Sequence, residues 1–254
     1  MALALDGVAQ TGTASTTASI SSNANAFSTS VNGSIICAFT HAEWLNAAGA
    51  AGTVGSVTGG GLTWTRRSNV ASMHTIGAPI TWNVAELWWA FCPTVLNNVT
   101  ITANYNLPGA NNFDNATLLV FAVTGFVGSS YQTNPWDGNA SLPKTNSSTS
   151  SSAPTTTGIS TTSANAMLLG LVGSPDTAVQ GSGAVNTNFT FITNVSAIGG
   201  SNESQAAAEF EVVSSTQSGI SIGWTTAQVG WIMLSDALAQ GAPDTLSGTN
   251  RLRM

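Results

Sequence analysis

Short segments in which apolar residues alternate with Ser, Thr or Asn recur along the whole chain. Residues 99–103 (VTITA) and 62–66 (LTWTR) alternate, whereas residues 34–40 (SIICAFT) and 118–124 (LLVFAVT) are mostly apolar. A period of two residues is the pattern of a half-buried β-strand, and a short apolar run is typical of a central strand buried on both faces. The chain has no sustained i, i+3, i+4 pattern. The sequence therefore predicts an all-β protein.

The composition favours the same fold class. Ser, Thr and Asn fill 87 of the 254 positions, but only five residues are Lys or Arg and eleven are Asp or Glu. Charged residues make up 6% of the chain, against roughly 25% in a typical soluble domain. Long helices are disfavoured, because their solvent faces usually carry Lys, Glu and Arg. The 43% hydrophobic content indicates a packed core rather than disorder.

The order of segments in the first half of the chain is repeated in the second half. Five segments, VNGSIICAF, GLTWTRRSNVAS, AELWWAF, NNVTITA and ATLLVFAVTG, are followed by SANAMLLGLV, NFTFITNVSA, AAEFEVVSS, SGISIGWTT and GWIMLSDAL. This alignment places Glu86 with Glu209 and Trp64 with Phe191. We expect a single jelly-roll-like β-sandwich of ten to twelve strands, in which each half supplies one sheet that covers the apolar face of the other. The alternative is two small sandwiches side by side.

The expected domain boundaries follow from this repeat. We expect one sandwich over residues 1–239, with halves at about residues 15–125 and 155–239. The connector, residues 126–154, contains an SSTSSS run that is typical of flexible surface chain. Residues 240–254 have no strand pattern and are predicted to form an extended C-terminal tail.

Charge and hydropathy limit the partners. A net charge of −6 and few basic residues argue against nucleic-acid binding, which needs clustered Lys and Arg. No apolar run approaches the roughly 20 residues of a membrane helix, so we expect no membrane partner. The N-terminal MALALDGVAQ lacks the basic region of a signal peptide, which favours a cytoplasmic origin. Cys37 and Cys92 are expected to be buried thiols, and a disulfide between them is the alternative.

Candidates for catalysis are few. His41 and His74 are the only histidines, and both are expected in loops, solvated or packed against the loop. Glu209 and Glu211 are two residues apart on one predicted strand and, like Glu86, are expected on a solvated edge or face. We find no nucleophile elbow, phosphate-binding Gly loop or calcium-loop pattern. We therefore expect no enzymatic activity, no cofactor and no metal.

Two tryptophans and two aspartates stand in segments predicted as loops. Most tryptophans lie in strand patterns, where core packing is their usual role. Trp44 and Trp136 are the exceptions, and they are the candidates for surface recognition, for example of a sugar ring. Asp114 and Asp137 stand beside Asn, where an Asx turn is the usual role of an aspartate.

Several motifs together suggest a family. GLTWTRRS, AELWWAFCP, NNVTITA, LLVFAVTGF, NPWDGNASLP and EFEVVSSTQSGISIGW resemble segments of Ser/Thr-rich jelly-roll proteins encoded by tailed bacteriophages and prophages. The resemblance covers about residues 5–239. It implies a virion component such as a head decoration protein, a head or tail fibre, or a related adhesion module, and it brings no catalytic motif.

The resulting expectation is a non-enzymatic virion structural protein, most specifically a capsid decoration or accessory protein on the particle exterior. Its partners would be the major capsid protein or other virion proteins, with further copies of itself as a homo-oligomer, after assembly in the host cytoplasm. Arg251, Leu252 and Arg253 at the end of the tail are the candidate docking residues. The alternative is a receptor- or glycan-binding module of a tail or fibre.

Overall fold

The structure is a computed structural model that describes residues 2–14, 21–45, 53–74, 81–106, 113–175, 188–199, 202–225 and 229–242. These residues form fifteen strands and one short 3-10 helix, so the all-β prediction is confirmed. The elements are β1 (Ala4–Ala14), β2 (Ser21–Phe27), β3 (Ser34–Leu45), β4 (Thr53–Gly59), β5 (Thr65–His74), β6 (Thr81–Cys92), β7 (Val99–Asn106), β8 (Phe113–Thr124), η1 (Ser130–Gln132), β9 (Lys144–Ser151), β10 (Thr155–Ile159), β11 (Ala166–Ser174), β12 (Thr190–Gly199), β13 (Asn202–Val213), β14 (Ile220–Gly223) and β15 (Val229–Ala239).

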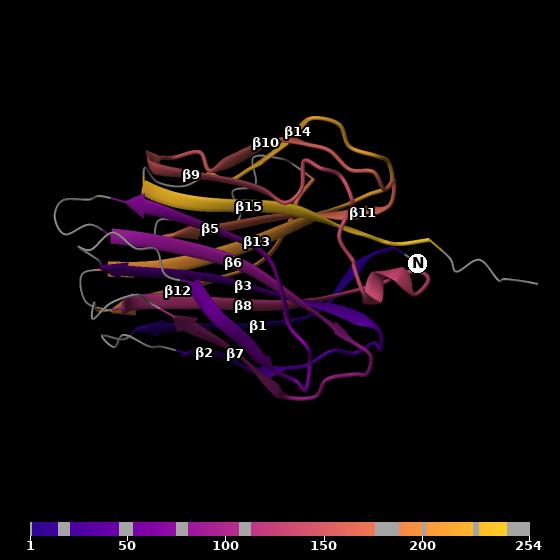
Figure 1. The fold of residues 1–254 in the computed structure, drawn as a ribbon, viewed down its shortest axis with the longest axis horizontal. Helices are drawn as coiled ribbons and strands as arrows, with labels where there is room; N and C mark the ends of the chain where they lie inside the picture. The colour runs from indigo at the N-terminus through magenta and orange to yellow at the C-terminus, as the bar shows by residue number, and fades with distance from the viewer. Residues whose placement is uncertain are drawn as a thin grey trace, which may run out of the picture.

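The strands form four antiparallel sheets stacked in layers. The two large sheets have the orders β1-β8-β3-β6-β5 and β12-β13-β11-β15-β9, and the two small sheets are β2-β7-β4 and β10-β14. Figure 1 shows β10 and β14 on one side of the molecule and β2 and β7 on the opposite side, with the large sheets between them. The expected ten to twelve strands are too few, because small sheets add a further layer on each outer face.

The first half has the connectivity of a jelly roll. In an eight-stranded jelly roll, strands 1, 8, 3 and 6 form one sheet and strands 2, 7, 4 and 5 form the other. Here β1-β8-β3-β6 and β2-β7-β4 follow this pattern, and β5 pairs with β6 instead of extending the small sheet.

The strand topology of the first half recurs in the second half. When β9, β11, β12, β13 and β15 are taken as the counterparts of β1, β3, β5, β6 and β8, the orders of the two large sheets become identical. The β10–β14 pair likewise corresponds to β2–β7. Each half thus contributes two sheets, whereas the sequence predicted one sheet per half.

The pairing of residues across neighbouring strands shows which residues of the two halves correspond. Glu86 pairs with Asn69 of β5, and Glu209 pairs with Phe191 of β12. Phe191 therefore corresponds to Asn69 and not to Trp64, which precedes β5. The sequence aligned the two glutamates correctly, but bulges in β5 and β12 shift the register beside them.

The large sheets pack face to face and enclose the main core. β1 lies against β12, β8 against β13, and β5 against β9. The two sheets therefore face each other with their equivalent strands in opposite order, so that β1 lies opposite the counterpart of β5. This arrangement gives the two halves an approximate twofold relation. The core side chains come from alternate positions of both sheets; among them are Ile35, Phe39, Leu87, Phe121, Leu169, Leu171, Ile232 and Leu234.

The small sheets cover the outer faces of the large ones. β2, β4 and β7 close a second apolar cluster around Ile36, Val120 and Ile101. β10 and β14 close a third cluster around Leu168, Ile222 and Trp224. Both faces of the central strands of the large sheets are therefore buried, which explains the nearly continuous apolar runs of β3, β8 and β11.

Adjacent tryptophans in β6 illustrate this double burial. Trp89 lies in the core between the large sheets, and Trp88 packs on the opposite face against the cluster below the small sheet. Cys37 and Cys92 are both buried, as the sequence predicted, and they form no disulfide with each other. Cys92 Sγ donates to the Thr94 carbonyl oxygen at 2.9 Å.

The predicted boundaries differ from the observed elements in three places. The hydroxyl-rich run in the connector forms strand β9 at an edge of a large sheet, because its backbone pairs with β15. The first half begins at β1, before residue 15. Gln240 belongs to the folded body, since its N–H donates to the Asn165 carbonyl oxygen at 3.0 Å and its own carbonyl oxygen accepts from the Val127 N–H at 2.8 Å.

Candidate functional site

Neither tryptophan predicted for surface recognition lies in the exposed loop expected for it. Trp136 is 4% exposed, so its predicted role at the surface is wrong. Trp44 belongs to β3 and pairs with Trp82 of β6, so its predicted loop position is also wrong. Arg251, Leu252 and Arg253, with the rest of residues 243–254, lie outside the described residues.

Trp136 packs against an ion pair, Arg67 with Asp236, that joins the two halves. The Arg67 guanidinium lies 5.0 Å from the centre of the Trp136 ring. Arg67 Nε donates to Asp236 Oδ2 at 2.7 Å, and Nη2 donates to Oδ1 at 3.2 Å. The Asp236 side chain is fully buried. The buried indole therefore holds the guanidinium that links β5 of the first half to β15 of the second.

A polar layer occupies one end of the main core. His41 Nδ1 lies 2.8 Å from Ser204 Oγ, and Thr117 Oγ1 lies 3.4 Å from the same oxygen. His41 and Thr117 come from the first half and Ser204 from the second, and all three are fully buried. These bonds link the two halves. Asn83, from β6, is also buried on this face.

The position of His41 contradicts its predicted place in a loop. It lies in β3, and its ring reaches the backbone of β11, where an added Cβ on Gly173 would lie 2.4 Å from His41 Cδ2. Burial lowers the pKa of His41 to about 3, so the imidazole is neutral at physiological pH. A neutral, fully enclosed His–Ser pair has no route to a substrate and serves to join the halves. His74 ends β5, and its side chain is not among those described.

The predicted solvated positions of Glu86 and Glu209 are also wrong. Glu86 is fully buried and Glu209 is 1% exposed, because the small sheets cover the faces on which they stand. Burial raises the pKa of Glu86, although bonds from Val54 and Trp88 and the charge of Arg66 oppose this. Glu211 remains half-buried.

Two aspartates fix the same loop in each half. Asp6 accepts bonds from the N–H groups of Ser30 and Val31, and Asp137 accepts bonds from those of Thr162 and Ser163. Burial tends to raise the pKa of both aspartates, but these bonds outweigh it and the net pKa is lowered. Asp137 also accepts from the Asn139 N–H at 2.9 Å, which is the Asx turn predicted for it.

The two aspartates share a short sequence pattern that lies outside the five recurring segments of the two halves. Each is followed by glycine, in Asp6–Gly7 and Asp137–Gly138, and each precedes its bonded loop by a similar distance along the chain. An Asp-Gly pair alone is common, so only its recurrence at matching places in the repeat distinguishes it.

The outer face of the small sheet β2-β7-β4 is polar but carries no charge. Its side chains form cross-strand bonds: Thr102 Oγ1 donates to Asn23 Oδ1 at 2.7 Å, and Thr100 Oγ1 donates to Asn25 Oδ1 at 3.0 Å. Alternate residues such as Ile101 point inward. We call this surface the neutral face. It consists of Asn23, Asn25, Ser56, Thr58, Thr100, Thr102 and Asn104.

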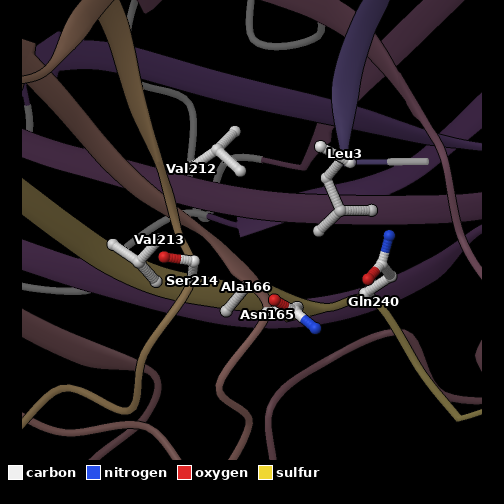
Figure 2. A pocket seen from close by; sticks show the side chains of 8 residues that line it. Leu3, Asn165, Ala166, Val212, Val213, Ser214 and Gln240 are labelled. Carbon is white, nitrogen blue, oxygen red and sulfur yellow. The ribbon is translucent and has the colours of Figure 1, made fainter.

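A shallow pocket of about 90 Å³ lies at the end of the molecule near the N-terminus. Figure 2 shows Leu3, Val212 and Gln240 around it, with Asn165 and Ser214 as further polar groups. Val212 is 39% exposed at its rim. This volume accommodates about one small apolar side chain, and the lining holds no charged residue.

The described residues contain no group of three His, Cys, Asp or Glu side chains placed to hold a metal. None of them belongs to a helix with the length and apolar character that a bilayer crossing requires. Comparison of the chain with protein-family models, curated proteins and solved structures finds no match.

Proposed function

We propose that this protein is a non-enzymatic structural component of a tailed-phage virion, a decoration or accessory protein bound to the capsid exterior. The observation that carries the proposal is the distribution of charge. Of the seven acidic side chains whose burial is described, five are buried: Glu43, Glu86, Asp137, Glu209 and Asp236.

A surface of this kind suits dense packing of identical copies. Like charges on neighbouring copies repel one another, and the repulsion grows as copies crowd onto a lattice. The neutral face presents Thr and Asn side chains that can exchange their mutual bonds for bonds to a neighbour. The layered fold supports the same proposal, since two jelly rolls joined through a buried core present a rigid body to the particle.

The proposal is tested by copy number on purified particles of the phage or prophage that encodes the chain. Quantitative mass spectrometry and a cryo-electron microscopy map should find hundreds of copies that follow the symmetry of the capsid lattice. A few copies at the tail would instead support the alternative adhesion module. Absence from the particle would overturn both.

Removal of residues 243–254 tests whether the segment with Arg251, Leu252 and Arg253 docks to a partner. Cutting after Ala242 keeps the bonds of Gln240, so the melting temperature of the isolated protein should not change. Incorporation into particles should fall and become less sensitive to salt, because two arginines are lost. The control is Arg251→Lys with Arg253→Lys, which keeps the charges. Normal incorporation of the shortened chain into particles would show that residues 243–254 are not a docking arm.

A further inference from the structure

The two jelly rolls carry a glutamate at equivalent positions with different surroundings. Glu86 in β6 and Glu209 in β13 each stand between two neighbouring strands of a large sheet and face its small covering sheet. Glu86 Oε1 accepts from the Val54 N–H at 2.9 Å, and Oε2 accepts from Trp88 Nε1 at 2.9 Å. Arg66 lies 3.8 Å from Glu86 Oε1. Two hydrogen bonds and a nearby arginine therefore stabilise the charged form of Glu86 in its buried position.

Glu209 has no comparable compensation. Its side chain is 1% exposed, and Oε1 is buried without a hydrogen-bond partner. A Cβ built on Gly170 would lie 2.8 Å from Glu209 Oε1 and 2.9 Å from Ile222 Cγ2. The carboxyl group thus lies between β11 and β14, in space that exists because residue 170 has no side chain.

No described cation offsets a charge on Glu209. β11, β12, β10 and β14 contribute no charged residue to its surroundings, and the neighbouring titratable group on its own face is Glu211, of like charge. Lys144 lies in β9, which is separated from β13 by β11 and β15. Ionisation of Glu209 would therefore require water.

We propose that Glu209 is a proton-controlled latch for the β10–β14 sheet: protonated, it stays packed beneath β14, and ionised, it lifts this sheet from the large one. The β10–β14 sheet is the element able to yield, because it has only two strands and forms no backbone ladder with the sheet beneath it. Its contacts with that sheet are side-chain contacts, such as those of Ile222 and Trp224 and the 2.6 Å bond between Thr156 Oγ1 and Ser235 Oγ. The first half should not respond, because Glu86 is compensated.

The direction of the pH effect follows from linkage. Burial raises the pKa of Glu209 from 4.5 to about 8. A raised carboxyl pKa gives stability that is complete below pH 4.5 and is lost as the pH rises through about 8. The latch should thus open on the alkaline side.

Hydrogen exchange of the intact protein, followed by mass spectrometry between pH 6 and pH 9.5 and corrected for intrinsic rates, tests the latch. Protection of peptides containing β14 and Trp224 should fall tenfold or more with a midpoint near pH 8, while peptides of β7 keep their protection. Glu209→Gln should abolish the transition, and Glu209→Met, which also cannot ionise, should do the same. The matched control, Glu86→Gln, should keep it. A flat profile for the natural protein, or the same transition in both Glu209 variants, would overturn the proposal.

Discussion

Replacement of Arg67 with alanine should lower the free energy of unfolding by about 3–5 kcal/mol, because it leaves Asp236 as an uncompensated charge in the core. The two hydrogen bonds of 2.7 and 3.2 Å and the cation–π contact with Trp136 are lost together. Chemical denaturation at pH 7 measures the change. Adding Asp236→Asn to this variant should recover part of the loss, since it removes the unpaired charge.

The adjacent arginine supplies the matched control. Arg66 lies 3.8 Å from Glu86 and its side chain is 45% exposed, so Arg66→Ala should cost less than about 1 kcal/mol. Equal losses in the two alanine variants would contradict the role assigned to the Arg67–Asp236 pair.

Gly173→Ala should disrupt the polar layer and lower the free energy of unfolding by about 2–4 kcal/mol, through overpacking and displacement of His41. The new methyl group would lie 2.4 Å from Cδ2 and 2.6 Å from Cγ of His41, and the ring cannot move without giving up its 2.8 Å contact with Ser204. Thermal and denaturant unfolding measure the loss.

Two comparisons make this result specific. Gly138→Ala should change stability by less than about 0.5 kcal/mol, because nothing lies within 4 Å of the added Cβ. His41→Ala combined with Gly173→Ala should cost less than the sum of the two single variants, because the clash is absent when the ring is absent. Strict additivity would show that Gly173 and His41 do not interact.

Alternation in the sequence predicted the sandwich because it reports directly which side chains share a face. Neighbouring residues of a strand point to opposite faces, as Trp88 and Trp89 do, and the repeat aligned Glu86 with Glu209. Alternation does not report what covers a face, and for that reason Glu86 and Glu209 were expected in solvent. The covering strands β4 and β10 are short and add little apolar signal of their own.

Other errors have the same physical origin. His41 and Trp44 extend β3 beyond its apolar run, so the predicted strand ended too early. β9 is built almost entirely from Ser, Thr and Asn, and its backbone bonds to β15 determine its conformation more than its side chains do. Trp136 is buried through the pairing of its segment with Leu238, a contact between residues far apart in the chain. Such long-range contacts leave no local pattern.

The buried carboxyl beneath β14 also affects the heat of unfolding. At neutral pH Glu209 is protonated in the native protein, whereas the unfolded chain, with its usual pKa of 4.5, has lost this proton. Unfolding therefore releases a proton from this site, which the buffer takes up with the buffer's own ionisation enthalpy. The calorimetric enthalpy of unfolding measured in phosphate and in Tris at the same pH should consequently differ. The ratio of this difference to the difference between the two buffers' ionisation enthalpies gives the number of protons released.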